Sequence, residues 1–254
     1  MLIIDEDTNQ VIVKKNNLTK SYAFDSQEAF DAVSKMMLRV GWDSKYVYSF
    51  TWLGRPIIQL PDDIMTIQEI IYEIKPDVIV EIGVAHGGSL ILSASICKSI
   101  EKGRVIGIDI DIRKHNRKAI EEHILFDYIT LIEGDSIAKK TFDKVKKLIC
   151  KDETVLVFLD GKHTKEHVLK ELELYSTLLS KNSYIVAMDG IQKDLVGAPR
   201  SNNDWQWNNP TEAAKEFVKH NPNFQITPFK PIFNESLLNS RPTYWPEAFI
   251  KKIK

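Results

Sequence analysis

The stretch VIVEIGVAHGGSL occupies residues 78–90 and decides how the rest of the chain is interpreted. A short run rich in branched apolar residues, typical of a buried strand, leads directly into a loop that contains Gly83, Gly87 and Gly88. Small and apolar residues follow the loop and favour a helix. A strand, a glycine-rich turn and a helix in this order predict the first strand–loop–helix unit of an open α/β sheet. In such sheets ligands bind beyond the carboxyl ends of the strands.

The alternation of strand and helix continues along the chain. Apolar runs predict five strands, at residues 77–83, 104–110, 128–134, 154–160 and 183–190. Amphipathic runs predict the helices between them, at residues 89–102, 113–125, 137–150 and 164–181. Residues 224–233 and 244–253 could supply two last strands. We therefore predict an α/β, Rossmann-like fold with a doubly wound, mostly parallel seven-stranded sheet.

The first 60 residues are less regular and predict a helical and extended appendage. A helix is expected over 25–40, with Asp25 or Ser26 as its N-cap and Glu28 near the capping-box position. We assign residues 1–60 to this appendage, which packs against the sheet or forms a subunit contact. Residues 61–254 form the main domain, with a helix over 62–76 that Pro76 ends, and a helix from about Pro210 that Asn209 caps.

Composition excludes several classes of protein. Hydrophobic residues make up 43% and charged residues 27%, and the formal net charge of -1 leaves no basic field for nucleic acid. The first ten residues are too acidic for a signal peptide, and no window approaches the ~18 apolar residues of a membrane span. Cys97 and Cys150, both in helix-like patterns, suit a reducing cytoplasm.

Three ligands compete for the glycine loop. A phosphate-binding P-loop needs Gly-Lys-Ser/Thr, but Ser89 follows Gly88 without a lysine. A dinucleotide loop prefers G-x-G-x-x-G, of which this loop is a degraded match, with Ala85 at the second glycine. S-adenosylmethionine needs no phosphate cradle; it needs room for a methionine tail and an acidic residue before the loop, which Glu81 provides.

Acidic residues also end the next two predicted strands. A carboxylate at Asp109 could accept both ribose hydroxyls of either cofactor. Asp135 and Ser136 lie where an adenine amino group and ring nitrogen would bind. His86, in the glycine loop, is expected to line the same pocket. The predicted cofactor-binding residues are Glu81, Gly83, Ala85, His86, Gly87, Gly88, Ser89, Asp109, Asp135, Ser136 and Asp160.

Over about residues 52–189 the chain resembles the cephalosporin hydroxylase family. Three stretches, in the order in which they occur, carry the resemblance: QLPDDIMTIQEIIYEIKPDVIVEIGVAHGGSL, VIGIDIDIRKHNRKAIEEH and LDGKHTKEHVLKELELYSTLLSKNSYIVAMDG. Members of that family look like S-adenosylmethionine-dependent O-methyltransferases and are similar to metal-dependent sugar O-methyltransferases. The resemblance implies a Rossmann-like methyltransferase fold, a bound methyl donor and a divalent cation such as Mg²⁺. It also implies a sugar or other small-metabolite acceptor and a homo-oligomer.

The fourth and fifth predicted strands end in a candidate reaction centre. Asp160 and Asp189 close these neighbouring strands and could share a hard cation, so both are predicted metal ligands. His163, three residues after Asp160, could take the proton of an activated hydroxyl, so His163 and Asp160 are the predicted catalytic residues. The family pattern has an acidic pair after the fifth strand, but here Met188 replaces the first acid, and a thioether does not bind Mg²⁺.

These observations favour an enzyme that methylates a hydroxyl of a sugar or other small metabolite in glycan or secondary-metabolite biosynthesis. Two alternatives stay open: an NAD-dependent oxidoreductase, which the same loop and Asp109 would suit, and a degenerate methyltransferase-like binding protein, which Met188 favours. Residues 191–209 lack periodicity and carry Trp205 and Trp207 among amides. They predict an active-site loop that stacks on a sugar or a nucleotide, or a simple lid or subunit contact.

Overall fold

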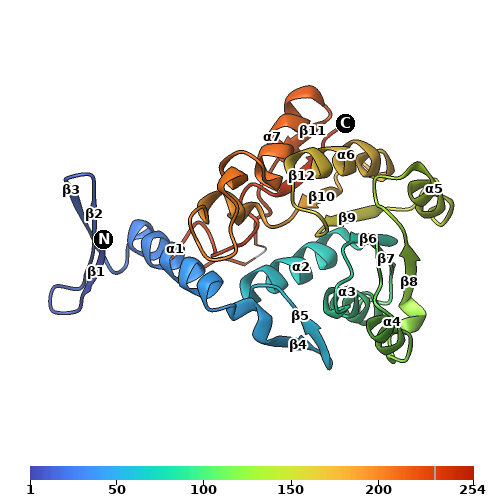
Figure 1. Cartoon of the computed structure of the whole chain (residues 1–254), viewed down its shortest axis with the longest axis horizontal. Helices are drawn as coiled ribbons and strands as arrows, with labels where there is room; N and C mark the ends of the chain where they lie inside the picture. The colour runs from blue at the N-terminus through green and yellow to red at the C-terminus, as the bar shows by residue number, and fades with distance from the viewer. Residues whose placement is uncertain (232) are drawn as a thin grey trace.

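A computed structural model describes residues 1–231 and 233–254. Its central sheet has the strand order β11-β12-β10-β9-β6-β7-β8, seven strands within the described residues (Figure 1). The strands are β6 Val78–Ile82, β7 Arg104–Asp109, β8 Ile129–Glu133, β9 Val155–Leu159, β10 Tyr184–Ala187, β11 Phe224–Ile226 and β12 Phe249–Lys252. The five strands from β6 to β10 run parallel, and β12 pairs antiparallel with both β10 and β11. The predicted α/β fold with a mostly parallel sheet is confirmed.

Helices cover both faces of this sheet. One apolar core packs α2 and α3 against it, and the other packs α5, α6 and α7 against the opposite face. The helices of the main domain are α2 Pro61–Ile74, α3 Gly88–Ser99, α4 Lys114–Glu121, α5 Lys139–Lys147, α6 Lys165–Tyr175 and α7 Pro210–His220. Every residue of β6, β9 and β10 is buried, which explains why these strands read as unbroken apolar runs.

Several predicted boundaries need correction. Predicted helices end earlier than expected, so Cys150 lies exposed beyond α5 instead of inside a helix, whereas Cys97 is buried in α3 as expected. The strand predicted over 224–233 is short, since β11 ends at Ile226, and residue 232 lies outside the described residues. Asn209 caps α7 through its side chain, as predicted.

The N-terminal segment contains more strand than the sequence predicted. Strands β1 Leu2–Asp5, β2 Gln10–Lys15 and β3 Leu18–Ala23 form an antiparallel meander, which α1 Gln27–Asp43 connects to the rest of the chain. In Figure 1 the meander and α1 extend to the left, away from the central sheet. Ser26, one of the two predicted N-caps, is the N-cap of α1 and accepts from the Ala29 amide, which leaves Glu28 one position before the capping-box position.

A second hairpin lies between α1 and α2. Strands β4 Phe50–Trp52 and β5 Arg55–Ile57 pair antiparallel, in agreement with the extended part of the appendage that the sequence predicts. Both strands contact α3, which follows the glycine loop. Among the described residues, no helix combines the length and the apolar character that crossing a bilayer requires.

Candidate functional site

The site lies where the order of the strands reverses. The chain passes from β6 outward through β7 to β8 and then returns to β9 on the other side of β6, which opens a crevice at the carboxyl ends of β6 and β9. The Asp160 amide donates to the Ile82 carbonyl over 2.7 Å and holds the two strand ends together. A Cβ on Gly83 would lie 2.0 Å from the Asp160 carbonyl oxygen, so this position accepts only glycine.

The other two glycines of the loop have packing partners of their own. Gly87 has φ +83°, and a Cβ there would lie 2.4 Å from the Ile120 side chain of α4. A Cβ on Gly88 would lie 2.2 Å from the Pro56 carbonyl oxygen of β5. The loop is therefore bare because α4 and the β4–β5 hairpin press on it. Contact between these glycines and a ligand stays a prediction.

Asp109 ends β7 and faces the glycine loop. Its Oδ2 accepts hydrogen bonds from the amides of Val84 at 2.8 Å and Ala85 at 3.3 Å, and its Oδ1 accepts from the Asp111 amide at 3.2 Å. The carboxylate thus caps the loop from within the protein. Binding of ribose hydroxyls by Asp109 stays a prediction. A bound ribose would donate to the same carboxylate that accepts from the loop amides.

Glu81 lies inside the sheet instead of at the tip of its strand. It is 2% exposed, and its side chain accepts a hydrogen bond from the Ser89 hydroxyl at the start of α3. Burial raises the pKa of Glu81 to about 7. The predicted acid before the loop is thus a buried anchor between β6 and α3, directly beneath the loop.

Asp135 and Ser136 follow β8, but their side chains bond within the protein. Asp135 accepts from the Ile137 amide at 3.2 Å, and the Ser136 hydroxyl donates to Glu171 over 2.6 Å. Tyr175 donates its hydroxyl to the Ser136 carbonyl over 3.0 Å. Glu171, fully buried in α6, is not among the predicted site residues, although a carboxylate on the apolar face of a predicted helix could have indicated it. Contact of Asp135 and Ser136 with adenine stays a prediction.

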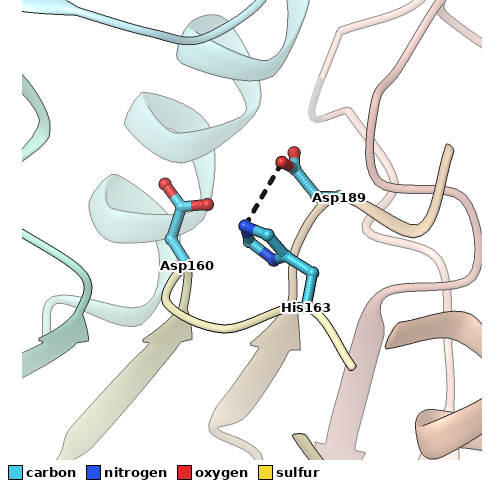
Figure 2. Close-up of side chains that lie close together, drawn as sticks. All are labelled: Asp160, His163 and Asp189. Carbon is cyan, nitrogen blue, oxygen red and sulfur yellow. Dashed lines mark ion pairs between the residues drawn. The ribbon is translucent and has the colours of Figure 1, made fainter. Parts of the chain in front are cut away.

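Asp160, His163 and Asp189 come together above the tips of β9 and β10, as Figure 2 shows. His163 Nε2 lies 3.5 Å from Asp189 Oδ2. One ligand atom from each of the three residues lies within 4.8 Å of the other two. His163 lies before the first residue of α6, whereas His167 lies within the helix, so the two histidines do not form a pair on one helix face. His167 Nε2 lies 3.1 Å from Glu171 Oε1.

Burial and neighbouring negative charges both act on the carboxyl group of Asp160. Burial raises its pKa well above the ordinary aspartate value, and the negative charges of Asp189 and Glu81 raise it further. A buried carboxylate that faces other carboxylates is typical of a site that binds a cation or exchanges a proton. Asp160 also lines a cavity of about 40 Å³ together with the glycine loop and residues 56–59, the end of β5 and the two residues after it.

Met188 does not take part in the carboxylate cluster. Its side chain is 1% exposed and packs in the apolar core on the α2 and α3 face of the sheet. A different acid does approach from α2: Asp63 accepts from the Thr243 hydroxyl at 2.5 Å and from the Tyr244 amide at 2.9 Å. Burial raises the pKa of Asp63 to about 8. Asp63 is not among the predicted site residues, because its partners Thr243 and Tyr244 lie far away in the chain.

The irregular segment 191–209 packs against α1. Trp42 donates its indole N–H to the Pro199 carbonyl over 2.7 Å, and its ring meets Trp205 edge-on at 5.7 Å between ring centroids. Trp207, in contrast, is 63% exposed. Of the two tryptophans, only Trp207 therefore offers a free surface, and a role of this segment in the active site stays a prediction.

A family model covers most of the chain, and curated relatives with a matching description are similar to part of it. The family model described as Rhamnosyl O-methyltransferase/CmcI matches residues 44–253. A rhamnosyl O-methyltransferase of Mycobacterium leprae (strain TN) is 29% identical over 153 residues, which cover 59% of this chain and 62% of that protein. The chain thus matches less than two thirds of the length of this curated relative.

Solved structures show the same fold. A structure of CmcI with Mg and SAM aligns with a TM-score of 0.54 and 19% identity, covering 82% of this chain and 78% of that chain. An O-methyltransferase from Bacillus cereus in complex with SAH aligns with a TM-score of 0.50 and 15% identity, covering 78% and 87% of the two chains. Similarity at this level concerns the architecture of the sheet and its helices.

Proposed function

The chain belongs to the rhamnosyl O-methyltransferase/CmcI family, and from that premise we propose that it transfers the methyl group of S-adenosylmethionine to a hydroxyl of a sugar or other small metabolite. The observation that carries the proposal is the position of Asp160. This residue lines the cavity beside the glycine loop and also belongs to the Asp160–His163–Asp189 cluster. Its position in both places supports a donor site that adjoins the reaction centre.

The donor site would use the edge formed by β6, β7 and β8. Asp109 and the glycine loop are bonded to each other, and Ser136 lies at the end of the next strand. The family match spans all of these elements. An NAD-dependent oxidoreductase, the alternative that the loop allowed, is not favoured by a match to a family described as O-methyltransferases.

His163 acts as the general base. Its Nε2 accepts the proton of the acceptor hydroxyl as that oxygen forms a bond to the methyl carbon and the carbon–sulfur bond breaks, leaving a neutral thioether. Asp189, whose Oδ2 lies 3.5 Å from the same Nε2, stabilises through its negative charge the imidazolium that this proton transfer forms. Because the donor loses its positive charge as the reaction proceeds, alignment of the two substrates is the main contribution of the chain.

The residues present fit a divalent cation. Two carboxylates and an imidazole place ligand atoms within 4.8 Å of one another, close to the separation that a six-coordinate ion requires. Asp160 and Asp189 would hold the ion, whereas the buried Met188 would not reach it. A cation at this position lowers the pKa of a bound hydroxyl and orients it. The CmcI structure described with Mg and SAM supports this assignment.

The acceptor and the assembly are further parts of the proposal. Rhamnosyl O-methyltransferases among the relatives support a deoxysugar in a glycan, a glycolipid or a secondary metabolite as acceptor. The exposed Trp207 and the amides around it support stacking on a sugar ring. The N-terminal arm, formed by β1 to β3 and α1, extends away from the central sheet and supports a homo-oligomer. Two free cysteines support a reducing, cytoplasmic compartment.

Calorimetry and a transfer assay test the proposal. We expect S-adenosylhomocysteine to bind with a micromolar dissociation constant and NAD not to bind. Labelled methyl should pass from S-adenosylmethionine to rhamnosides in a panel of small alcohols, and chelation with EDTA should slow transfer at least tenfold, reversibly on addition of Mg²⁺. Binding of NAD without S-adenosylhomocysteine would instead support the oxidoreductase.

A further inference from the structure

The β4–β5 hairpin lies directly on the glycine loop, although the two are far apart in the sequence. Trp52 donates its indole N–H to the Ser95 hydroxyl of α3 over 3.0 Å, and the Leu53 carbonyl lies 3.1 Å from His123 Nε2. Pro56 touches Gly88 so closely that a Cβ on that glycine would lie 2.2 Å from the Pro56 carbonyl oxygen. The hairpin therefore forms the outer wall of the loop.

Arg55 joins this wall to the loop backbone. Its Nε and Nη2 both donate to the His86 carbonyl oxygen, at 3.0 and 2.5 Å, and Nη2 also donates to Asn116 Oδ1 at 3.2 Å. Asn116, which is 3% exposed in α4, donates its Nδ2 to the Ala85 carbonyl over 2.8 Å. Two consecutive loop carbonyls are thus held by side chains from two separate elements.

The loop needs this support because its backbone is strained. Ala85 has φ +44° and Gly87 has φ +83°, both in the left-handed region. For alanine this conformation is unfavourable and persists only where surrounding contacts impose it. On the inner side, Asp109 binds the amides of Val84 and Ala85. Arg55 and Asn116 fix the carbonyls on the outer side.

The same hairpin also shapes the cavity. Residues 56–59 line the cavity of about 40 Å³ opposite residues 83–89, and Asp160 completes its wall. A change at Arg55 would alter both walls of that cavity, since the residue lies in β5 and binds the loop. Arg55 itself does not line the cavity, so its effect on a ligand would pass through the loop and the hairpin.

We infer that Arg55, with Asn116, is a positioning residue for the methyl donor: it holds the glycine loop in the shape that receives the methionine tail of a sulfonium nucleoside. This inference rests on the proposed methyltransferase function. The guanidinium's forked donors suit the position because two N–H groups converge on one carbonyl while Nη2 also reaches the Asn116 amide oxygen. A lysine side chain has a single nitrogen and could not reproduce the pair of N–H groups, from Nε and Nη2, that converge on the His86 carbonyl.

The test compares Arg55→Ala, Arg55→Lys and Asn116→Ala with Arg104→Ala. Arg104 is the matched control because its guanidinium also binds backbone carbonyls, of Asp77 and Leu148, but at the opposite end of the sheet. Measurements are the dissociation constant of S-adenosylhomocysteine by calorimetry, KM for the donor, kcat at saturating donor, thermal midpoint, and hydrogen exchange of the amides in residues 84–87.

We expect Arg55→Ala to raise the dissociation constant and KM for the donor about tenfold and to leave kcat within about threefold. Arg55→Lys should have an intermediate effect, and the Arg55→Ala/Asn116→Ala double variant should lose less affinity than the sum of the single changes, because the two side chains act on one loop. Hydrogen exchange at 84–87 should accelerate in Arg55→Ala. Arg104→Ala should lower the thermal midpoint without weakening binding.

Two results would overturn the inference in different ways. If the wild-type protein binds S-adenosylhomocysteine and Arg55→Ala binds it equally well, Arg55 is not a positioning residue while the proposed function stands. If the wild-type protein does not bind S-adenosylhomocysteine, the proposed function fails and the role of Arg55 fails with it. If Arg55→Ala and Arg104→Ala lose the same affinity, the weaker binding results from lower stability of the protein. That result would also exclude Arg55 as a positioning residue.

Discussion

Asp63 shows what a buried carboxylate does to the stability of this protein. Burial raises its pKa to about 8, whereas in the unfolded chain an aspartate ionises near 3.9. Between these values the folded state keeps a proton that the unfolded state has lost, so the free energy of unfolding falls as pH rises from about 4 to about 8. For one group the slope reaches about 1.4 kcal/mol per pH unit.

Asp63→Asn should remove this dependence. The amide oxygen can still accept from the Tyr244 amide and the amide N–H can donate to the Thr243 hydroxyl, so the variant resembles the protonated acid at every pH. We expect urea unfolding between pH 5 and pH 8 to show a shallower decline than in the wild type and higher stability at pH 8. Asp152→Asn, at an exposed position, is the control. An unchanged slope would contradict the raised pKa.

His163 should separate chemistry from donor binding. Replacement by alanine removes the proposed base but no residue that lines the cavity beside the glycine loop. We expect kcat to fall by a hundred- to ten-thousandfold and the dissociation constant of S-adenosylhomocysteine to stay within a few fold. His220→Ala, at the exposed end of α7, should change neither quantity. Normal turnover in His163→Ala would remove the histidine from the mechanism.

Which site residues the sequence revealed depends on how locally their positions are determined. Asp160 and Asp189 directly follow apolar strands, and parallel strands bring their carboxyl ends to one edge, so their proximity could be predicted. Asp63 and Glu171 each lie inside a helix, where a carboxylate ordinarily faces solvent. Their burial depends on Thr243 and Ser136, partners that no local pattern identifies.

At the scale of elements, the hairpin and the glycine loop depend on each other through Gly88. A methyl group there would collide with the Pro56 backbone at 2.2 Å, and backbone atoms give way less easily than a flexible side chain. We expect Gly88→Ala to cost more than 2 kcal/mol of stability and to weaken donor binding, measured by urea unfolding and calorimetry.

Gly54→Ala is the matched control in the same hairpin. Gly54 has φ +85° and no atom within 4 Å of an added Cβ, so alanine there adds backbone strain alone, about 1 kcal/mol. Equal effects of the two substitutions would mean that the hairpin tolerates the collision by shifting as a unit. Such a result would contradict close packing between Pro56 and the loop.

The regular elements were predictable, and the docking of the hairpin was not. Periodicity predicts the strands and helices of the main domain because each buries a regular face in one of two cores. The meander of β1 to β3 was missed because β3 has no fully buried residue and gives no apolar alternation to detect. The hairpin's contact with the loop depends on Arg55, whose partners could not be identified from spacing.

For the whole molecule, the N-terminal arm formed by β1 to β3 and α1 raises the question of assembly. Figure 1 shows it extended away from the central sheet. Among the described residues of α1 only Ala29 is buried, while Val33, Met36, Met37 and Val40 are between 36 and 56% exposed. These four recur at three- and four-residue steps and so form one apolar stripe. Stripes of this kind on a soluble protein mark contact surfaces.

A second copy of the chain is the partner that we expect on this stripe, because the resemblance to the cephalosporin hydroxylase family implies a homo-oligomer. The Met37→Glu/Val40→Glu double variant should place two charges in the contact and reduce the mass in light scattering to that of a single 29.2 kDa chain. Ile124→Glu is the control, because Ile124 is 82% exposed but lies after α4, outside the arm. A wild-type protein that is already monomeric, or a double variant with unchanged mass, would exclude the stripe as the subunit contact. Since the stripe lies on the arm and the site lies at the strand ends of the main domain, donor binding should persist in the dissociated variant.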